Sequence, residues 1–162
     1  TAAEAEKVLA ATEDGARTRF EYSVACIGAS VCQQGVRDSQ ALYHACVKAA
    51  READLPDGAL PVIHISGCPS SCGTHQVGAL GFHGGVKLVD KKPHPAFTLH
   101  VNGSARMGEE RFGESWGVIF EERIPEFLVA LGRKVAATGL SFEEWLPAHE
   151  DELRALAADY LV

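Results

Sequence analysis

Hydrophobic and polar residues are patterned along this 162-residue chain in a way that predicts helices near both ends and strands between them. Residues 2–11 are rich in alanine, glutamate and other helix formers and predict a short first helix. A second helix is predicted from an N-cap at Asp38 or Ser39 to about Ala53. Later helices are predicted from Pro125 to before Gly139, from the capping-box sequence at 141–144, and over 149–161.

Apolar or alternating runs predict the strands, which lie at 20–25, 60–66, 86–89, 97–102 and 118–120. Between them we expect a turn at 57–58, a glycine-punctuated stretch at 77–85, a turn at 91–93 and an exposed loop over 103–115. Strand–helix–strand, then several strands, then helices is the order of an α+β domain with a mixed β-sheet flanked by helices. We divide the chain into a helical lead-in (1–19), the α+β domain (20–138) and C-terminal helices packed on it (139–162).

Composition and charge narrow the class of protein. The chain is 46% hydrophobic, which suits one compact domain with a core. No apolar run approaches the ~18–20 residues that span a bilayer, and no basic-then-apolar leader is present, so we expect a soluble, cytoplasmic protein. The formal net charge is −7. Nucleic acid is not an expected partner, because backbone binding needs a basic surface.

Four of the five cysteines fall into two pairs, each in a loop that contains glycine or serine and follows an apolar run. Cys26 and Cys32 have the spacing C-x5-C, and Cys68 and Cys72 have the spacing C-x3-C. If the fold brings the two loops together, four thiolates can face one inorganic centre. Four thiolates are the usual ligand set of a [4Fe–4S] cluster.

Three other interpretations compete with this cluster. Four cysteines also make structural zinc sites, but cysteine pairs in such sites usually lie about 2–4 residues apart, and C-x5-C is longer. Disulfides are unusual in a chain without a secretory leader. Cysteines in glycine-flanked pairs are a poor match for plain core residues. The spacing alone therefore favours an iron–sulfur cluster and leaves zinc as the first rival.

The fifth cysteine is interpreted as structural. Cys46 falls in a predicted helix and shares one face of it with apolar neighbours at helical spacing. That face comprises Leu42, Ala45, Cys46 and Ala49. A free cysteine in such a pattern is usually a small buried apolar residue.

Around the paired cysteines the sequence resembles the C-terminal iron–sulfur and sirohaem half of the nitrite and sulfite reductases, over roughly 20–135. The matching residues are Cys26-x5-Cys32, Gly67-Cys68-Pro69-x-x-Cys72-Gly73, and the later Gln76, Gly81, Phe82 and Gly84. The family usually has Asn after Cys-Pro, where this chain has Ser70, and Gly-Gly where it has Asn102-Gly103. Neither difference falls on a cysteine.

The resemblance implies a fold, two cofactors and a reaction. Residues 20–138 would form the cofactor domain of an oxidoreductase that reduces nitrite to ammonia or sulfite to sulfide with six electrons. The [4Fe–4S] ligands would be Cys26, Cys32, Cys68 and Cys72, with Cys72 also bridging to the sirohaem iron. Ser70, Ser71 and His75 are the further cofactor-site candidates, His75 because it lies close to Cys72 in sequence. The implied partners are the preceding half of the same reductase, an electron donor such as ferredoxin or a flavoprotein, and a small anion.

Basic residues for that anion are scarce. Sirohaem carries several carboxylates and its substrates are anions, so a complete site needs converging Arg and Lys. The cysteine loops contain none, and Arg37 and Lys87 are the nearest. We therefore expect no catalytic residue in this chain and no activity from these 162 residues alone. The alternative is an iron–sulfur electron-transfer or metal-binding module without haem.

Four histidines invite a metal or proton-donor role. His64 and His100 lie on alternating strand patterns, so we interpret each as a strand histidine with an ordinary hydrogen-bond partner. His83 falls in the glycine-punctuated stretch and is assigned no role. His75 is the one expected to support the cofactor site.

Overall fold

A five-stranded mixed sheet forms the centre of the fold in a computed structural model that describes residues 1–12 and 15–162. The strands lie side by side in chain order and are β1 (Val24–Ala25), β2 (Ile63–Ser66), β3 (Leu80–Val89), β4 (Lys92–Val101) and β5 (Glu114–Phe120). β1, β2 and β3 are parallel, whereas β3, β4 and β5 are antiparallel. The expected α+β class with a mixed sheet is confirmed.

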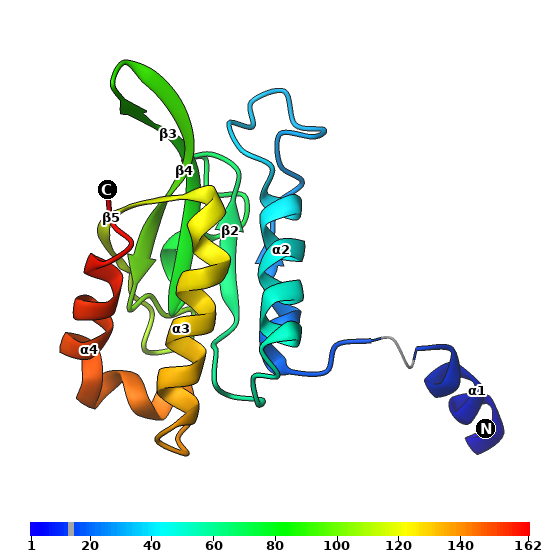
Figure 1. Cartoon of the computed structure of the whole chain (residues 1–162). Coiled ribbons are helices and arrows are strands. Elements are labelled where there is room, and N and C mark those ends of the chain that lie inside the picture. The colour runs from blue at the N-terminus through cyan, green and yellow to red at the C-terminus, as the bar shows by residue number, and fades with distance from the viewer. Residues whose placement is uncertain (13–14) are drawn as a thin grey trace.

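Three helices lie against one face of this sheet, α2 (Ser39–Glu52), α3 (Ile124–Ala136) and α4 (Phe142–Ala158) (Figure 1). Asp38 caps α2 by accepting a 3.0 Å hydrogen bond from the Ala41 N–H, so the first of the two proposed caps is correct. Ser141 and Glu144 form the predicted capping box of α4. The last helix expected over 149–161 is present as the second part of α4, because the backbone at His149 is non-helical and divides the element, and this part ends at Ala158.

The first helix, α1 (Ala2–Ala11), stands apart from the rest of the fold (Figure 1) and buries none of its residues. Short 3₁₀ helices complete the chain as η1 (Arg19–Tyr22), η2 (His75–Val77) and η3 (Glu121–Arg123). None of the helices within the described parts of the chain is long and apolar enough to cross a membrane.

The core lies between the sheet and the three helices. Because side chains alternate along a strand, Leu80 and Phe82 of β3 point to the helices and are completely buried. Phe97 and Leu99 of β4 do the same. Residues at the alternate positions of the two strands, including His83 and His100, therefore belong to the opposite face of the sheet.

On α2 the buried residues include Leu42, Cys46 and Ala50, whereas Ala45 is exposed, so the buried face of the helix is rotated slightly from the predicted one.

The strand predicted at 20–25 is mostly wrong. Arg19–Tyr22 is the 3₁₀ helix η1, and only Val24–Ala25 is extended. The alternating pattern reflects a turn that buries Phe20 in the core and directs the Glu21 carboxylate to Arg51, with Nη2 and Oε2 2.5 Å apart.

Most of the glycine-punctuated stretch at 77–85 is also strand, because β3 begins at Leu80. β3 and β4 form a ten-residue-per-strand hairpin whose turn is Asp90 and Lys91, both at positive φ. The predicted turn at 91–93 is therefore too late, since Lys92 and Pro93 already belong to β4. β5 likewise begins at Glu114, earlier than the predicted start at 118.

Candidate functional site

The first cysteine of each pair follows one of two neighbouring parallel strands. Cys26 comes directly after β1, and its N–H continues the ladder by donating to the Ile65 carbonyl of β2 at 3.0 Å. Cys68 comes two residues after β2 ends at Ser66. Carboxyl ends of adjacent parallel strands meet at one edge of a sheet, so the topology itself places the two cysteine loops next to each other.

Gly67 joins the two loops. Its carbonyl accepts hydrogen bonds from the Val36 N–H at 3.0 Å and the Arg37 N–H at 2.8 Å, both at the end of the first loop. Its own N–H donates to Cys26 Sγ at 3.1 Å. A Cβ added at Gly67 would lie 2.5 Å from the Arg37 carbonyl oxygen, so only glycine allows this approach.

Cys26 has the most polar surroundings of the four thiols. Burial alone would raise its pKa, but hydrogen bonds from Ser39 and the Gly67 amide outweigh burial and hold the pKa of Cys26 below its usual value. Cys26 Sγ lies 3.2 Å from Ser39 Oγ, and the same hydroxyl lies 2.7 Å from the Cys26 carbonyl oxygen, so its single proton can serve either acceptor. Donors aimed at sulfur stabilise a thiolate, which is the form that binds metal.

The other three cysteines sit on the loops themselves. Cys32 and Cys68 are half-buried and Cys72 is exposed. Cys32 is fixed by its N–H, which donates to the Gly28 carbonyl at 2.8 Å. The structure thus brings the two loops together, but the four thiols do not form a compact group of ligand atoms within the described residues.

The remaining predicted cofactor contacts divide into two exposed loop positions and one buried histidine. Ser70 is exposed, and the half-buried Ser71 donates its hydroxyl to the Gln76 side chain. His75 is only 2% exposed, and its Nδ1 lies 2.9 Å from Ser66 Oγ. Its ring is therefore buried against Ser66 at the end of β2.

Cys46 carries no chemistry in this arrangement. It is 1% exposed on the inner face of α2, and burial strongly raises the pKa of its thiol. This agrees with its interpretation as a small apolar core residue.

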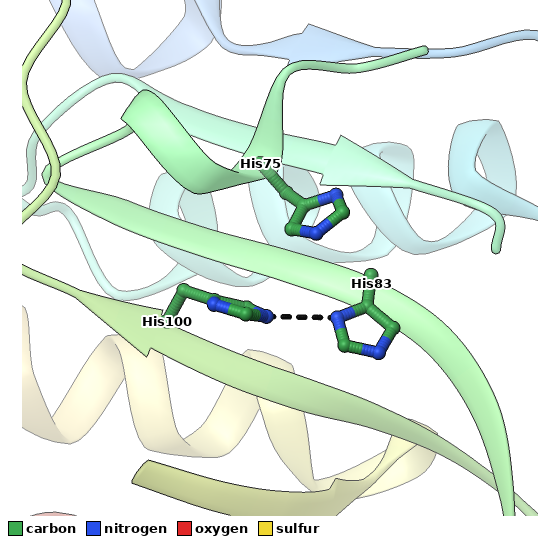
Figure 2. A group of neighbouring side chains, drawn as sticks. All are labelled: His75, His83 and His100. Atoms are coloured by element: carbon green, nitrogen blue, oxygen red, sulfur yellow. Dashed lines mark hydrogen bonds between the residues drawn. The ribbon is translucent and has the colours of Figure 1, made fainter. Parts of the chain in front are cut away.

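A second cluster of metal-ligating groups was not anticipated. One ring nitrogen from each of His75, His83 and His100 can lie within 4.8 Å of the corresponding nitrogens of the other two. His83 Nδ1 and His100 Nε2 are 2.8 Å apart, and the His75 ring lies over both of them (Figure 2). Among residues 1–12 and 15–162 this is the one such group of three or more His, Cys, Asp or Glu side chains.

The hairpin register brings these histidines together. Gly81 of β3 pairs with His100 of β4, and His83 pairs with Thr98, so the two histidines are diagonal neighbours on the sheet face away from the helices. η2 carries His75 onto the same face. The approach is close because a Cβ at Gly81 would lie only 1.8 Å from the His75 carbonyl oxygen. The hairpin turn at 90–91 sets this register for His83 and His100, and the turn expected at 91–93 does not give it.

Burial lowers the pKa of all three imidazoles. The pKa of His75 falls to about 4, first because of burial and then because His100 and His83 disfavour a further positive charge. Burial is also the main cause of the lowered pKa values of His83 and His100. His64, by contrast, has the ordinary partner expected for it, with Nδ1 2.8 Å from Thr74 Oγ1.

The two basic residues nearest the loops are already occupied. Arg37 Nε pairs with Glu121 Oε2 at 2.9 Å, and Lys87 Nζ donates to the Val162 carbonyl at 2.7 Å. Neither is presented to an anion at the cysteine loops.

Comparisons with known proteins identify the fold. No family model matches the chain, and no curated protein sequence matches it. Among solved structures it is similar to the Mycobacterium tuberculosis NirA protein, with a TM-score of 0.72 and 20% sequence identity over 93% of this chain. The match spans 30% of the NirA chain. At this identity the likeness establishes a shared fold.

Proposed function

We propose that this chain is the cofactor-binding part of a sirohaem-dependent nitrite or sulfite reductase. The observation that carries the proposal is the junction at Gly67, where two cysteine loops from adjacent parallel strands are hydrogen-bonded to one another. The fold shared with part of the NirA protein and the resemblance of the cysteine motifs support the same conclusion.

The residues at the loops fit an iron–sulfur cluster. Cys26, Cys32, Cys68 and Cys72 would be its ligands, three of them half-buried and the last exposed. The exposed Cys72 would also hold the sirohaem, and Ser70 and Ser71, which precede it in the same loop, are the further candidates to contact it. Cluster and haem joined in this way would supply single electrons to an anion bound at the haem. Within the described residues the four thiols do not form a compact ligand group, so cluster binding would require these side chains to rotate.

Exposed apolar side chains on the first loop support a protein partner. Ile27, Val31 and Val36 are 56%, 68% and 43% exposed and flank the first cysteine pair. Apolar groups gathered at the edge of a cofactor site are typical of a surface that another domain covers. We propose that the preceding half of the reductase covers it and supplies the Arg and Lys that the anions need. An electron donor such as ferredoxin or a flavoprotein completes the system.

Anaerobic reconstitution tests this proposal. The chain is incubated with ferrous iron and sulfide, then with sirohaem, and its bound iron, bound sulfide and visible spectrum are measured. We expect one cluster per chain and, when the preceding half of the reductase is supplied, sirohaem absorption bands that change when the cluster is reduced. Cys68→Ser should abolish the cluster, whereas Cys46→Ala should retain it, because Cys46 is buried in α2.

The spectrum also separates the alternative. A cluster that retains no sirohaem even when the preceding half of the reductase is supplied would favour an iron–sulfur electron-transfer module. A colourless protein that binds zinc through the four cysteines and no cluster would overturn the proposal. Cys72→Ser sharpens the assignment of the bridge, because it should remove the haem bands together with the cluster.

A further inference from the structure

The three clustered histidines offer a second ligand set that the cysteine loops do not use. They come from three different elements, η2, β3 and β4, and converge on the sheet face away from the helices (Figure 2). We propose that His75, His83 and His100 bind a divalent transition-metal ion, with Zn²⁺ the expected occupant. This site is distinct from the proposed iron–sulfur site.

The geometry is near that of a three-histidine zinc site. Tetrahedral zinc with Zn–N bonds of about 2.0–2.1 Å places its nitrogen ligands about 3.4 Å from one another. The candidate nitrogens all lie within 4.8 Å of one another, and those of His83 and His100 are 2.8 Å apart. Small rotations of the rings therefore suffice to bind an ion. A water molecule would take the fourth position.

Ser66 orients the most buried of the three ligands. Its hydroxyl lies 2.9 Å from His75 Nδ1 and accepts the Gly73 N–H at 3.0 Å. With Nδ1 held in this way, Nε2 of His75 is left to face the other two rings. Ligating histidines usually bond their second ring nitrogen to a neighbouring group, which fixes both tautomer and orientation.

Burial keeps the three imidazoles in the neutral form that binds metal. His75 is 2% and His100 is 9% exposed. Neutral imidazole is the form that binds metal, and a buried triplet of imidazoles disfavours the protonated form. His100 Nδ1 is buried with no hydrogen-bond partner of normal geometry, so the packing of the cluster is not explained by hydrogen bonding alone.

Zinc titration of a variant without the four loop cysteines tests the site. Changing Cys26, Cys32, Cys68 and Cys72 to serine removes the competing thiolates, and circular dichroism checks the fold. Chelator-treated protein is titrated with Zn²⁺ alone. We expect one ion per chain, with at least tenfold weaker binding after His83→Gln or His100→Gln. His64→Gln is the matched control, since His64 lies on neighbouring β2 outside the cluster. The Zn²⁺ affinity of this variant should stay within twofold of that of the four-serine parent.

Two further measurements keep the outcome decisive. Ser66→Ala should weaken Zn²⁺ binding by about tenfold, the effect of losing a group that orients a ligand. Co²⁺ bound to the same four-serine variant should show tetrahedral visible bands that His83→Gln removes. Equal Zn²⁺ affinity in the His83→Gln, His100→Gln and His64→Gln variants would overturn the proposal. So would the absence of stoichiometric binding. Neither result bears on the iron–sulfur site, because its ligands are absent from the titrated variant.

Discussion

The cysteine loops and the histidine cluster meet at Ser66 but are built in opposite ways. The cysteines lie on loops at the strand ends, and one of them, Cys72, is exposed. The histidines lie on two strands and a short helix, and their rings contact one another with centroids 4.8 to 5.0 Å apart. Ligands on loops can rearrange around a bulky cofactor, whereas ligands on a sheet are held at the spacing that the register dictates. The first arrangement suits a cluster assembled after folding, and the second suits a small ion.

Glycines set the position of both regions. Gly67 holds the two cysteine loops together, and Gly81 lets η2 approach β3 so that His75 reaches its partners. Substitutions at these two positions should therefore damage one region more than the other. If both substitutions damage both regions equally, the two regions are not positioned independently.

The largest effect is expected for Gly81→Ala. The added Cβ would lie 1.8 Å from the His75 carbonyl oxygen, a backbone atom that cannot move without displacing η2. We expect a loss of about 3 kcal/mol in the free energy of unfolding, measured with urea, and loss of zinc binding at the histidines. Gly85→Ala is the matched control in the same strand, because no heavy atom lies within 4 Å of its added Cβ. Similar stability of the two variants would show that η2 does not depend on Gly81.

Gly67→Ala should have a somewhat smaller effect on stability and a different effect on function. Its Cβ would lie 2.5 Å from the Arg37 carbonyl oxygen, but the first loop can move away from it. We expect a loss of about 2 kcal/mol in unfolding free energy, together with loss of the reconstituted cluster. Zinc binding at the histidines should persist. If the cluster still forms at full occupancy, the junction at Gly67 is not what assembles the cysteine site.

The pH dependence of the metal-free protein should report on the histidines and not on the loops. The folded-state pKa of His75 is about 4, below the ordinary value, so the unfolded chain takes up its proton first as the pH falls. The stability that neutral His75 contributes to the fold is complete above the ordinary histidine pKa of about 6.5. It is lost as the pH falls towards the folded-state pKa of His75. Between pH 7.5 and 5.5 we expect this group to lower the unfolding free energy by about 1 kcal/mol.

Urea titrations at several pH values, compared with those of His75→Gln, measure this contribution. The variant should show a shallower fall in stability, with the remaining slope due to His83, His100 and His64, whose pKa values are also lowered by burial. Identical slopes would mean that His75 is not held in its neutral form by the fold.

Much of the fold followed from local patterns. The helix 2–11, the Asp38 cap and the Ser141–Glu144 capping box were all correct, because each depends on neighbours within one or two turns. The errors fell where packing overrode local preference. Phe20 turns into the core within η1, and the glycines of 77–85 serve close packing on a strand instead of turns.

The sequence by itself determined that two cysteine pairs follow apolar segments, and their spacing pointed to an inorganic centre. It could not determine that Gly67 locks the loops together, because that contact joins backbones about 30 residues apart, whose meeting depends on parallel strand pairing. Nor could it reveal the histidine cluster. His75, His83 and His100 have no common spacing, and only the hairpin register and the approach of η2 place their rings together. Side chains far apart along a chain become neighbours through tertiary pairing, which local periodicity does not encode.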